Sequence, residues 1–173
     1  MKINWKKLIV CLLIPLAVGG LATLLSGGMS GYRAINQPPL SPPGWIFPIV
    51  WTILYLLMGY SSYRVVMSGA GPEAIRKALT FYGAQLALNF LWPIIFFGFD
   101  LYLVAFLILI ALWVLIFLTI RAFSKIDEKA ADLLLPYLLW VTFAGYLNLG
   151  VYLLNLPLEN WKKCDIMDLS SKH

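Results

Sequence analysis

Five long stretches of this chain contain no charged residue, and apolar side chains dominate them. A helix rises about 1.5 Å per residue, so roughly 20 apolar residues cross the ~30 Å hydrocarbon core of a bilayer. The stretches do not alternate polar and apolar residues, as strands of a membrane β-barrel would. The pattern therefore predicts an all-α integral membrane protein, a bundle of five transmembrane helices. The uncharged stretches are 8–32, 34–63, 78–99, 101–120 and 133–158.

Turn and helix-breaking residues set the expected helix ends. The run from Gly98 to Asp100 leaves a very short turn, so the third and fourth helices should be antiparallel neighbours. Asp100 and Asp132 place a negative charge where the fourth and fifth helices should start. Pro93 should bend the third helix beside Trp92. The expected helices are 8–26, 45–63, 78–97, 101–121 and 132–154, within a transmembrane domain 1–157 that a polar tail, 158–173, follows.

The longest expected connection, 27–44, is rich in glycine and proline. Its run QPPLSPPG, residues 37–44, cannot be helical throughout, because proline lacks an amide hydrogen and restricts the residue before it. Loops of this length between packed helices are uncommon and often functional. We expect a semi-rigid flap over one mouth of the bundle, with a stiff linker as the alternative.

Composition and charge support a membrane protein and indicate its orientation. The 173 residues are 61% hydrophobic and 12% charged, whereas soluble domains carry about 25% charged residues. The net charge of +5 comes from basic residues near helix ends, which indicates membrane orientation rather than a nucleic-acid partner. More basic residues fall on the side of the N-terminus than on the opposite side. The positive-inside rule therefore predicts a cytoplasmic N-terminus and an external C-terminus.

Several kinds of chemistry lack the residues they would need. No ionisable residue lies in the middle of an expected span, and the single histidine is His173, at the end of the chain. Ionisable residues inside a membrane usually mark ion paths and proton relays, so ion-coupled transport is disfavoured. The sequence contains no Cys/His metal-binding pattern, no phosphate-binding glycine loop and no Ser/His/Asp set. We expect no metal and no cofactor.

Aromatic and amide side chains recur three or four residues apart on the second, third and fifth expected helices. Such an interior suits a flat, largely apolar ligand, because rings stack on planar molecules and an amide can orient a carbonyl or carboxylate. The alternative is structural, since aromatic rings fill bundles and asparagine hydrogen-bonds between helices. The residues are, helix by helix, Trp51 and Tyr55; Asn89, Trp92 and Phe96; and Trp140, Phe143, Ala144 and Asn148.

Three blocks of sequence resemble the translocator protein family, also known as the tryptophan-rich sensory protein or peripheral benzodiazepine receptor family. They occur in the family's order within the five expected spans. The blocks are QPPLSPPGWIFPIVWTILYLLMG (37–59), QLALNFLWPIIFF (85–97) and LPYLLWVTFAGYLN (135–148).

The resemblance implies a five-helix bundle, commonly dimeric, that binds porphyrins in a pocket beneath the first loop. It also implies sterols or benzodiazepine-site drugs as ligands, and we expect a bacterial cell membrane. Gly83 and Ala87 have the spacing that lets another helix approach closely, which suits internal packing and a homodimer equally. Some bacterial members are reported to degrade protoporphyrin IX in light with two pocket tryptophans, which correspond here to Trp51 and Trp140. The resemblance places in the same pocket Tyr32, Tyr55, Asn89, Trp92, Phe143 and Ala144.

The sequence departs from the family pattern in the flap and in the fifth helix. Gln37 and Leu40 stand where the family usually has a lysine and an aromatic residue. The loss of a charge and a ring should lower the affinity for an anionic porphyrin. The family's sterol motif needs a basic residue close after a tyrosine. The next base after Tyr152 is Lys162, so the motif is absent there.

These patterns favour a membrane receptor, sensor or regulator that binds tetrapyrroles. A light-dependent enzyme that degrades protoporphyrin IX is an alternative, with Trp51 and Trp140 as its catalytic residues. A passive translocator of porphyrin or sterol is another, because no residue offers energy coupling. A purely structural or regulatory role, without any small-molecule ligand, is the fourth possibility.

Overall fold

The computed structural model describes residues 3–27 and 35–156, and every regular element in these ranges is a helix. Residues 28–34 of the expected flap, which include Tyr32, and the expected polar tail lie outside the described residues. The elements are α1 (Trp5–Leu25), α2 (Ile46–Val66), α3 (Pro72–Pro93), the π-helix η2 (Ile94–Gly98), α4 (Tyr102–Ser124), α5 (Glu128–Asp132) and α6 (Leu135–Leu154).

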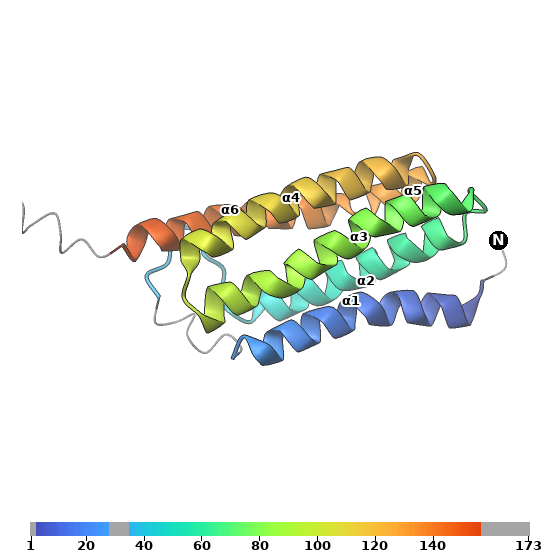
Figure 1. Cartoon of the computed structure of the whole chain (residues 1–173). Coiled ribbons are helices and arrows are strands. Elements are labelled where there is room, and N and C mark those ends of the chain that lie inside the picture. Colours follow the sequence, from blue (N-terminus) through green and yellow to red (C-terminus); the bar gives the residue numbers. More distant parts are fainter. Residues whose placement is uncertain (1–2, 28–34, 157–173) are drawn as a thin grey trace, which may run out of the picture.

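Within the described residues, five helical segments are long and apolar enough to cross a membrane, which confirms the predicted fold class. Many large apolar side chains face outward, as a lipid environment requires; Leu24 and Leu139 are examples. The segments run side by side (Figure 1), with α1 against α2 and α3, and with α4 against α3 and α6. The predicted antiparallel pairing of α3 and α4 is confirmed. The membrane-crossing segments are Trp5–Leu25, Ile46–Val66, Pro72–Gly98, Tyr102–Ser124 and Glu128–Leu154.

Two predicted helix starts are wrong. The third helix begins at Pro72, six residues before the predicted start, because Pro72 occupies the first turn and Glu73 places a negative charge there. The predicted fifth helix from 132 is instead two helices. Asp127 caps the short α5 by accepting a hydrogen bond from the Ala130 amide. Pro136 lies in the first turn of α6, where its missing amide hydrogen costs nothing.

The third helix changes its geometry at Pro93. The α-helical hydrogen-bond pattern ends at this residue, and η2 continues the segment as a π-helix. Proline removes one amide donor and its ring crowds the preceding turn, and π-helical turns often occur at functional sites. This change of geometry sets the positions of Phe96 and Phe97 relative to Trp92 on the turn before.

Candidate functional site

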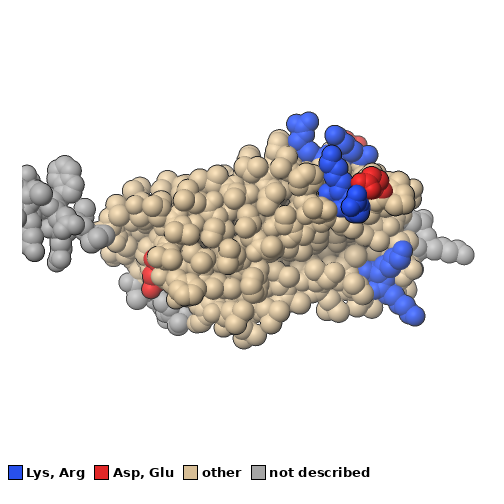
Figure 2. Space-filling view, in the orientation of Figure 1, with Lys and Arg blue, Asp and Glu red and all other residues tan. Residues whose placement is uncertain are grey.

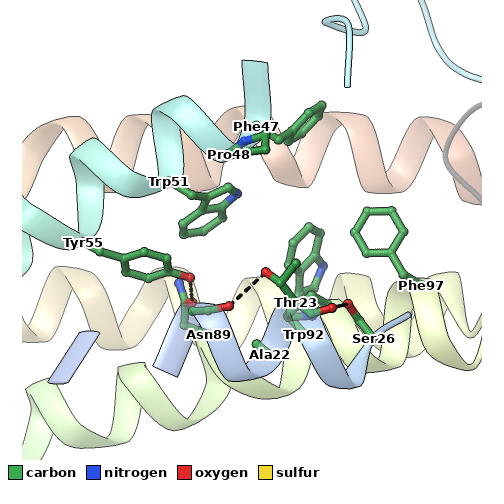
Figure 3. A pocket seen from close by; sticks show the side chains of 12 residues that line it. Ala22, Thr23, Ser26, Phe47, Pro48, Trp51, Tyr55, Asn89, Trp92 and Phe97 are labelled. Carbon is green, nitrogen blue, oxygen red and sulfur yellow. Dashed lines mark hydrogen bonds between the residues drawn. The ribbon is translucent and has the colours of Figure 1, made fainter. Parts of the chain in front are cut away.

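A cavity of about 140 Å³ lies between α1, α2 and the end of α3. Figure 3 shows Trp51 and Tyr55 of α2 pointing toward Asn89 and Trp92 of α3, with side chains of α1 beside them. The lining is mostly apolar and aromatic. It consists of Gly19, Ala22, Thr23, Ser26, Phe47, Pro48, Trp51, Tyr55, Asn89, Trp92, Pro93 and Phe97.

Trp51 is the centre of the aromatic cluster. Its ring stacks on Tyr55 with centroids 5.4 Å apart, and it lies 6.5 Å from the ring of Trp92. The ring of Tyr137, from α6, meets it edge to face, with the centroids 6.1 Å apart. Gly19 makes room for this arrangement, because a methyl group there would overlap the Tyr55 ring. A larger residue at position 19 would therefore displace the Tyr55 ring.

Hydrogen bonds connect α2, α3 and α6 directly behind these rings. The Tyr55 hydroxyl donates to Asn89 Oδ1 (2.9 Å), and Asn89 Nδ2 donates to the Tyr137 hydroxyl (2.8 Å). Tyr137 in turn donates to Gln85 Oε1 (2.8 Å). Asn89 is thus held between two helices, which is the structural role that the sequence left open.

Asn148 ties together another three elements. Its Oδ1 accepts from the indole N–H of Trp92 (3.2 Å), and its Nδ2 donates to the backbone carbonyl of Tyr102 (2.9 Å). The bond to Asn148 fixes the orientation of the Trp92 ring. Asn148 therefore acts on the cavity through Trp92.

A second, much smaller cavity of about 20 Å³ adjoins the first. Phe47, Trp92 and Phe97 line both cavities and so separate them. Ala144 and Asn148 of α6 line only the second, together with Phe96. The side chains predicted to share one interior are thus divided between two adjoining spaces.

Trp140 and Phe143 lie beside this partition without lining either cavity. The Trp140 ring is 5.9 Å from Phe47 and 5.7 Å from Phe143. Its indole N–H is buried and has no hydrogen-bond partner among the described residues. An unpaired buried donor costs free energy, so Trp140 is a donor available to a molecule that enters the bundle.

The second half of the predicted flap packs on α6. Pro38 lies so close to Gly150 that a methyl group added to Gly150 would overlap the Pro38 ring. The Tyr146 hydroxyl donates to the Pro39 carbonyl (2.8 Å). Asn155 accepts from the Asn36 amide and donates to its carbonyl (3.2 and 3.0 Å). These contacts hold the segment near Ser41, which lines the second cavity.

The comparison with known families covers most of the chain. The model of the TspO/MBR family matches residues 9–154. The chain belongs to this family.

Relatives of this TspO/MBR protein come from bacteria, archaea and animals. A tryptophan-rich protein TspO of Chlorobaculum tepidum is 35% identical, over 86% of this chain and 95% of its own. A protein of the same name from Archaeoglobus fulgidus is 39% identical, over 88% of this chain and 99% of its own. The translocator protein of Ovis aries is 36% identical, over 83% of this chain and 87% of its own.

The sequence pattern did not predict that α1 contributes to the candidate site of this TspO/MBR protein. Gly19, Ala22, Thr23 and Ser26 recur at helical spacing and face the cavity. None of the four is aromatic or charged, so only their helical spacing could have indicated that they share a face. Tyr137 was also missed, although it follows Pro136 within the third sequence block.

Three residues of α3 and α4 lie on the outside of the TspO/MBR bundle. Trp113 of α4 is 37% exposed and donates to the Thr142 hydroxyl (2.8 Å). Gly83 and Ala87 are not buried on α3, and a methyl group on Gly83 would meet open space, so this pair is not used for close packing within the chain.

The cavities of this TspO/MBR protein contain no acidic or basic side chain from the described segments. No group of three His, Cys, Asp or Glu residues that could hold a metal occurs in the described part of the chain. The ion pair between Arg64 and Asp127 (2.8 Å) lies near the opposite end of the bundle. Burial there raises the pKa of Asp127, but hydrogen bonds from Arg64 and the Ala130 amide outweigh it and leave the pKa below its ordinary value.

Proposed function

We propose that this protein binds a tetrapyrrole of the protoporphyrin IX type, and other hydrophobic small molecules, as a membrane receptor, sensor or tetrapyrrole regulator. The observation that carries this proposal is the cluster of Trp51, Tyr55 and Trp92 around an uncharged cavity. Flat aromatic molecules gain free energy by stacking on such rings. The unpaired indole N–H of Trp140 supplies a donor for a polar atom of the ligand.

Binding of a macrocycle requires the two cavities to merge and also to widen. Their volumes of about 140 and 20 Å³ are below the ~300 Å³ typical of small-molecule pockets. Phe47 and Phe97 line both, so movement of these two rings would join the spaces and bring a ligand to Ala144 and Trp140. Charged carboxylates would cost free energy in this apolar interior, so we place them at the end nearest residues 35–45.

The test is a titration of protoporphyrin IX into detergent-solubilised protein. Tryptophan fluorescence should fall and reach a plateau near one equivalent, because the ligand lies against Trp51 and Trp92. A sterol or a benzodiazepine-site ligand that occupies the same cavity should displace the porphyrin. Quenching that never saturates, or that equals uptake by empty micelles, contradicts the proposal.

Light-dependent breakdown of the bound porphyrin is a second candidate function. The observation that favours it is the set of oxidisable rings in contact, in which Trp51 adjoins Tyr55, Trp92 and Tyr137. An indole would donate an electron to the photoexcited macrocycle, with dioxygen as the final oxidant.

The bleaching rate of bound porphyrin under constant illumination tests this enzyme. It should fall several-fold in a Trp51→Phe/Trp140→Phe protein and stay unchanged in Trp113→Phe, because Trp113 faces away from the cavities. Equal bleaching in all three proteins would mean that the chain only binds the pigment.

We also infer that the N-terminus lies in the cytoplasm and the C-terminus outside, in a bacterial cell membrane. Figure 2 shows Lys and Arg side chains gathered at one end of the molecule. Of the described charged residues, that end holds eight basic and four acidic ones, and the opposite end holds only Asp100. The positive-inside rule places the basic end in the cytoplasm.

A further inference from the structure

The basic end of the bundle contains a groove that the proposed ligand site does not involve. It lies between the start of α3 and the end of α4, and its volume is about 340 Å³. Lys77 comes from α3, while Arg121 and Lys125 come from the last turn of α4 and the residue after it. Phe81 and Leu118 form an apolar wall on the side toward the bilayer core.

The three cations have no ion-pair partner among the described residues. The ion pairs formed by described residues join Arg64 to Asp127 and Arg76 to Glu73, and neither includes a residue of the groove. No carboxylate from the described segments lines it. The Arg121 guanidinium lies over the Phe117 ring, 6.0 Å from its centroid, which keeps the charge near the helix surface.

The groove lies at the depth of lipid headgroups. Arg121 follows Leu101 by 20 residues along the helix axis, which is about 30 Å, the thickness of a bilayer core. Lys77 and Phe97 are separated by the same number of residues on the α3–η2 segment. If Leu101 and Phe97 mark one boundary of the core, the basic groove is at the other.

Small residues create the hollow. Ala74, Ala78 and Ala122 line the groove, and their methyl groups leave the space that larger side chains would fill. The result is a cationic rim above an apolar trough. Its charge matches a phosphate diester, and its wall matches an acyl chain.

We propose that this groove binds one anionic phospholipid, with the headgroup phosphate on Lys77, Arg121 and Lys125 and an acyl chain against Phe81 and Leu118. Basic pockets between transmembrane helices bind anionic headgroups in this way. Such a lipid would connect the start of α3 to the end of α4. The proposal does not depend on tetrapyrrole binding.

Native mass spectrometry of the full chain from mixed phosphatidylglycerol and phosphatidylcholine tests the site. We expect the wild-type protein to retain one phosphatidylglycerol in preference to phosphatidylcholine. The Lys77→Gln/Arg121→Gln/Lys125→Gln protein should retain at least about tenfold less of it, since each basic residue contributes about fivefold to anionic-lipid binding. Added inorganic phosphate should not displace the lipid, because phosphate lacks the acyl chain.

The matched control is Lys6→Gln/Lys7→Gln/Lys129→Gln, which removes three charges from the same end without touching the groove. Ala74→Phe fills the trough at an exposed position and leaves every charge in place, so it should also lose the lipid. Helical circular dichroism in phosphatidylcholine alone verifies that each variant is folded. Equal losses in the two triple variants, or equal retention of both lipids by the wild type, would overturn the proposal.

Discussion

Single buried polar side chains hold this bundle in register more than they stabilise it. Asn89 and Asn148 each bond to two neighbouring elements through one amide group. Hydrogen bonds between membrane helices contribute only about 0.6 kcal/mol on average. However, each requires a particular rotation of both helices, and that rotation turns Trp51, Tyr55 and Trp92 toward one cavity. The same amides therefore set the site without needing to touch the ligand.

Gly59 is a residue at which a single methyl group should lower stability, because the backbone of α1 lies against it. A Cβ atom there would lie 2.7 Å from both the Cys11 carbonyl oxygen and the Leu12 Cα, which are backbone atoms of α1. We expect Gly59→Ala to lower the free energy of unfolding by about 1–3 kcal/mol, the usual cost of overpacking. Thermal unfolding in detergent, followed by circular dichroism, measures the effect.

Gly83→Ala is the matched control for this substitution. Apart from the backbone of its own helix, no atom lies within 4 Å of the position that the new methyl group would take. The substitution should be neutral or stabilising by up to about 1 kcal/mol, because alanine favours helix more than glycine does. If the Gly59→Ala protein unfolds at the same temperature as the Gly83→Ala protein, the result would contradict the close packing of α1 on α2 at Gly59.

At the scale of elements, hydropathy predicts which segments cross the membrane better than where helices end. All five spans and the α3–α4 pairing were predictable, because uncharged runs and short turns report on them directly. The early start of α3 at Pro72 and the break before α6 were not. Outside the bilayer core, capping residues and prolines decide where a helix begins and ends. A hydropathy pattern does not reveal these residues.

The lining of the first cavity was predictable in part. The faces of α2 and α3 were identified, because Trp51, Tyr55, Asn89 and Trp92 stand at helical spacing. The face of α1 was not, since small residues at the same spacing also occur in ordinary packing. The separation by Phe47 and Phe97 into two cavities depends on tertiary packing, which helical spacing alone does not specify.

Charges at the helix ends should fix the orientation of the elements. Alkaline phosphatase, which is active only outside the cytoplasm, should be active when fused after residue 173. The same enzyme inserted at Gly69, in the turn between α2 and α3, should be inactive, because that turn lies at the basic end. The opposite pattern of activity would reverse the inferred topology.

The two proposed binding sites lie at opposite ends of the molecule. The basic end presents an interfacial groove between α3 and α4, and the opposite end has the aromatic cavities beside the segment 35–45. Both lie on a helix bundle that belongs to the TspO/MBR family. Our central proposal is that a flat tetrapyrrole enters the bundle at the aromatic end and contacts Trp51 and Trp140.

The most direct test is the dissociation constant of protoporphyrin IX, measured by the absorbance of the pigment, for three proteins. Trp51→Leu/Trp140→Leu should bind about tenfold or more weakly than the wild type, because each lost ring contact is worth about 0.5–1.5 kcal/mol. Trp113→Leu removes an indole from the outer face and should bind like the wild type. Wild-type affinity in the double variant, or an equal loss in Trp113→Leu, would contradict the assigned site.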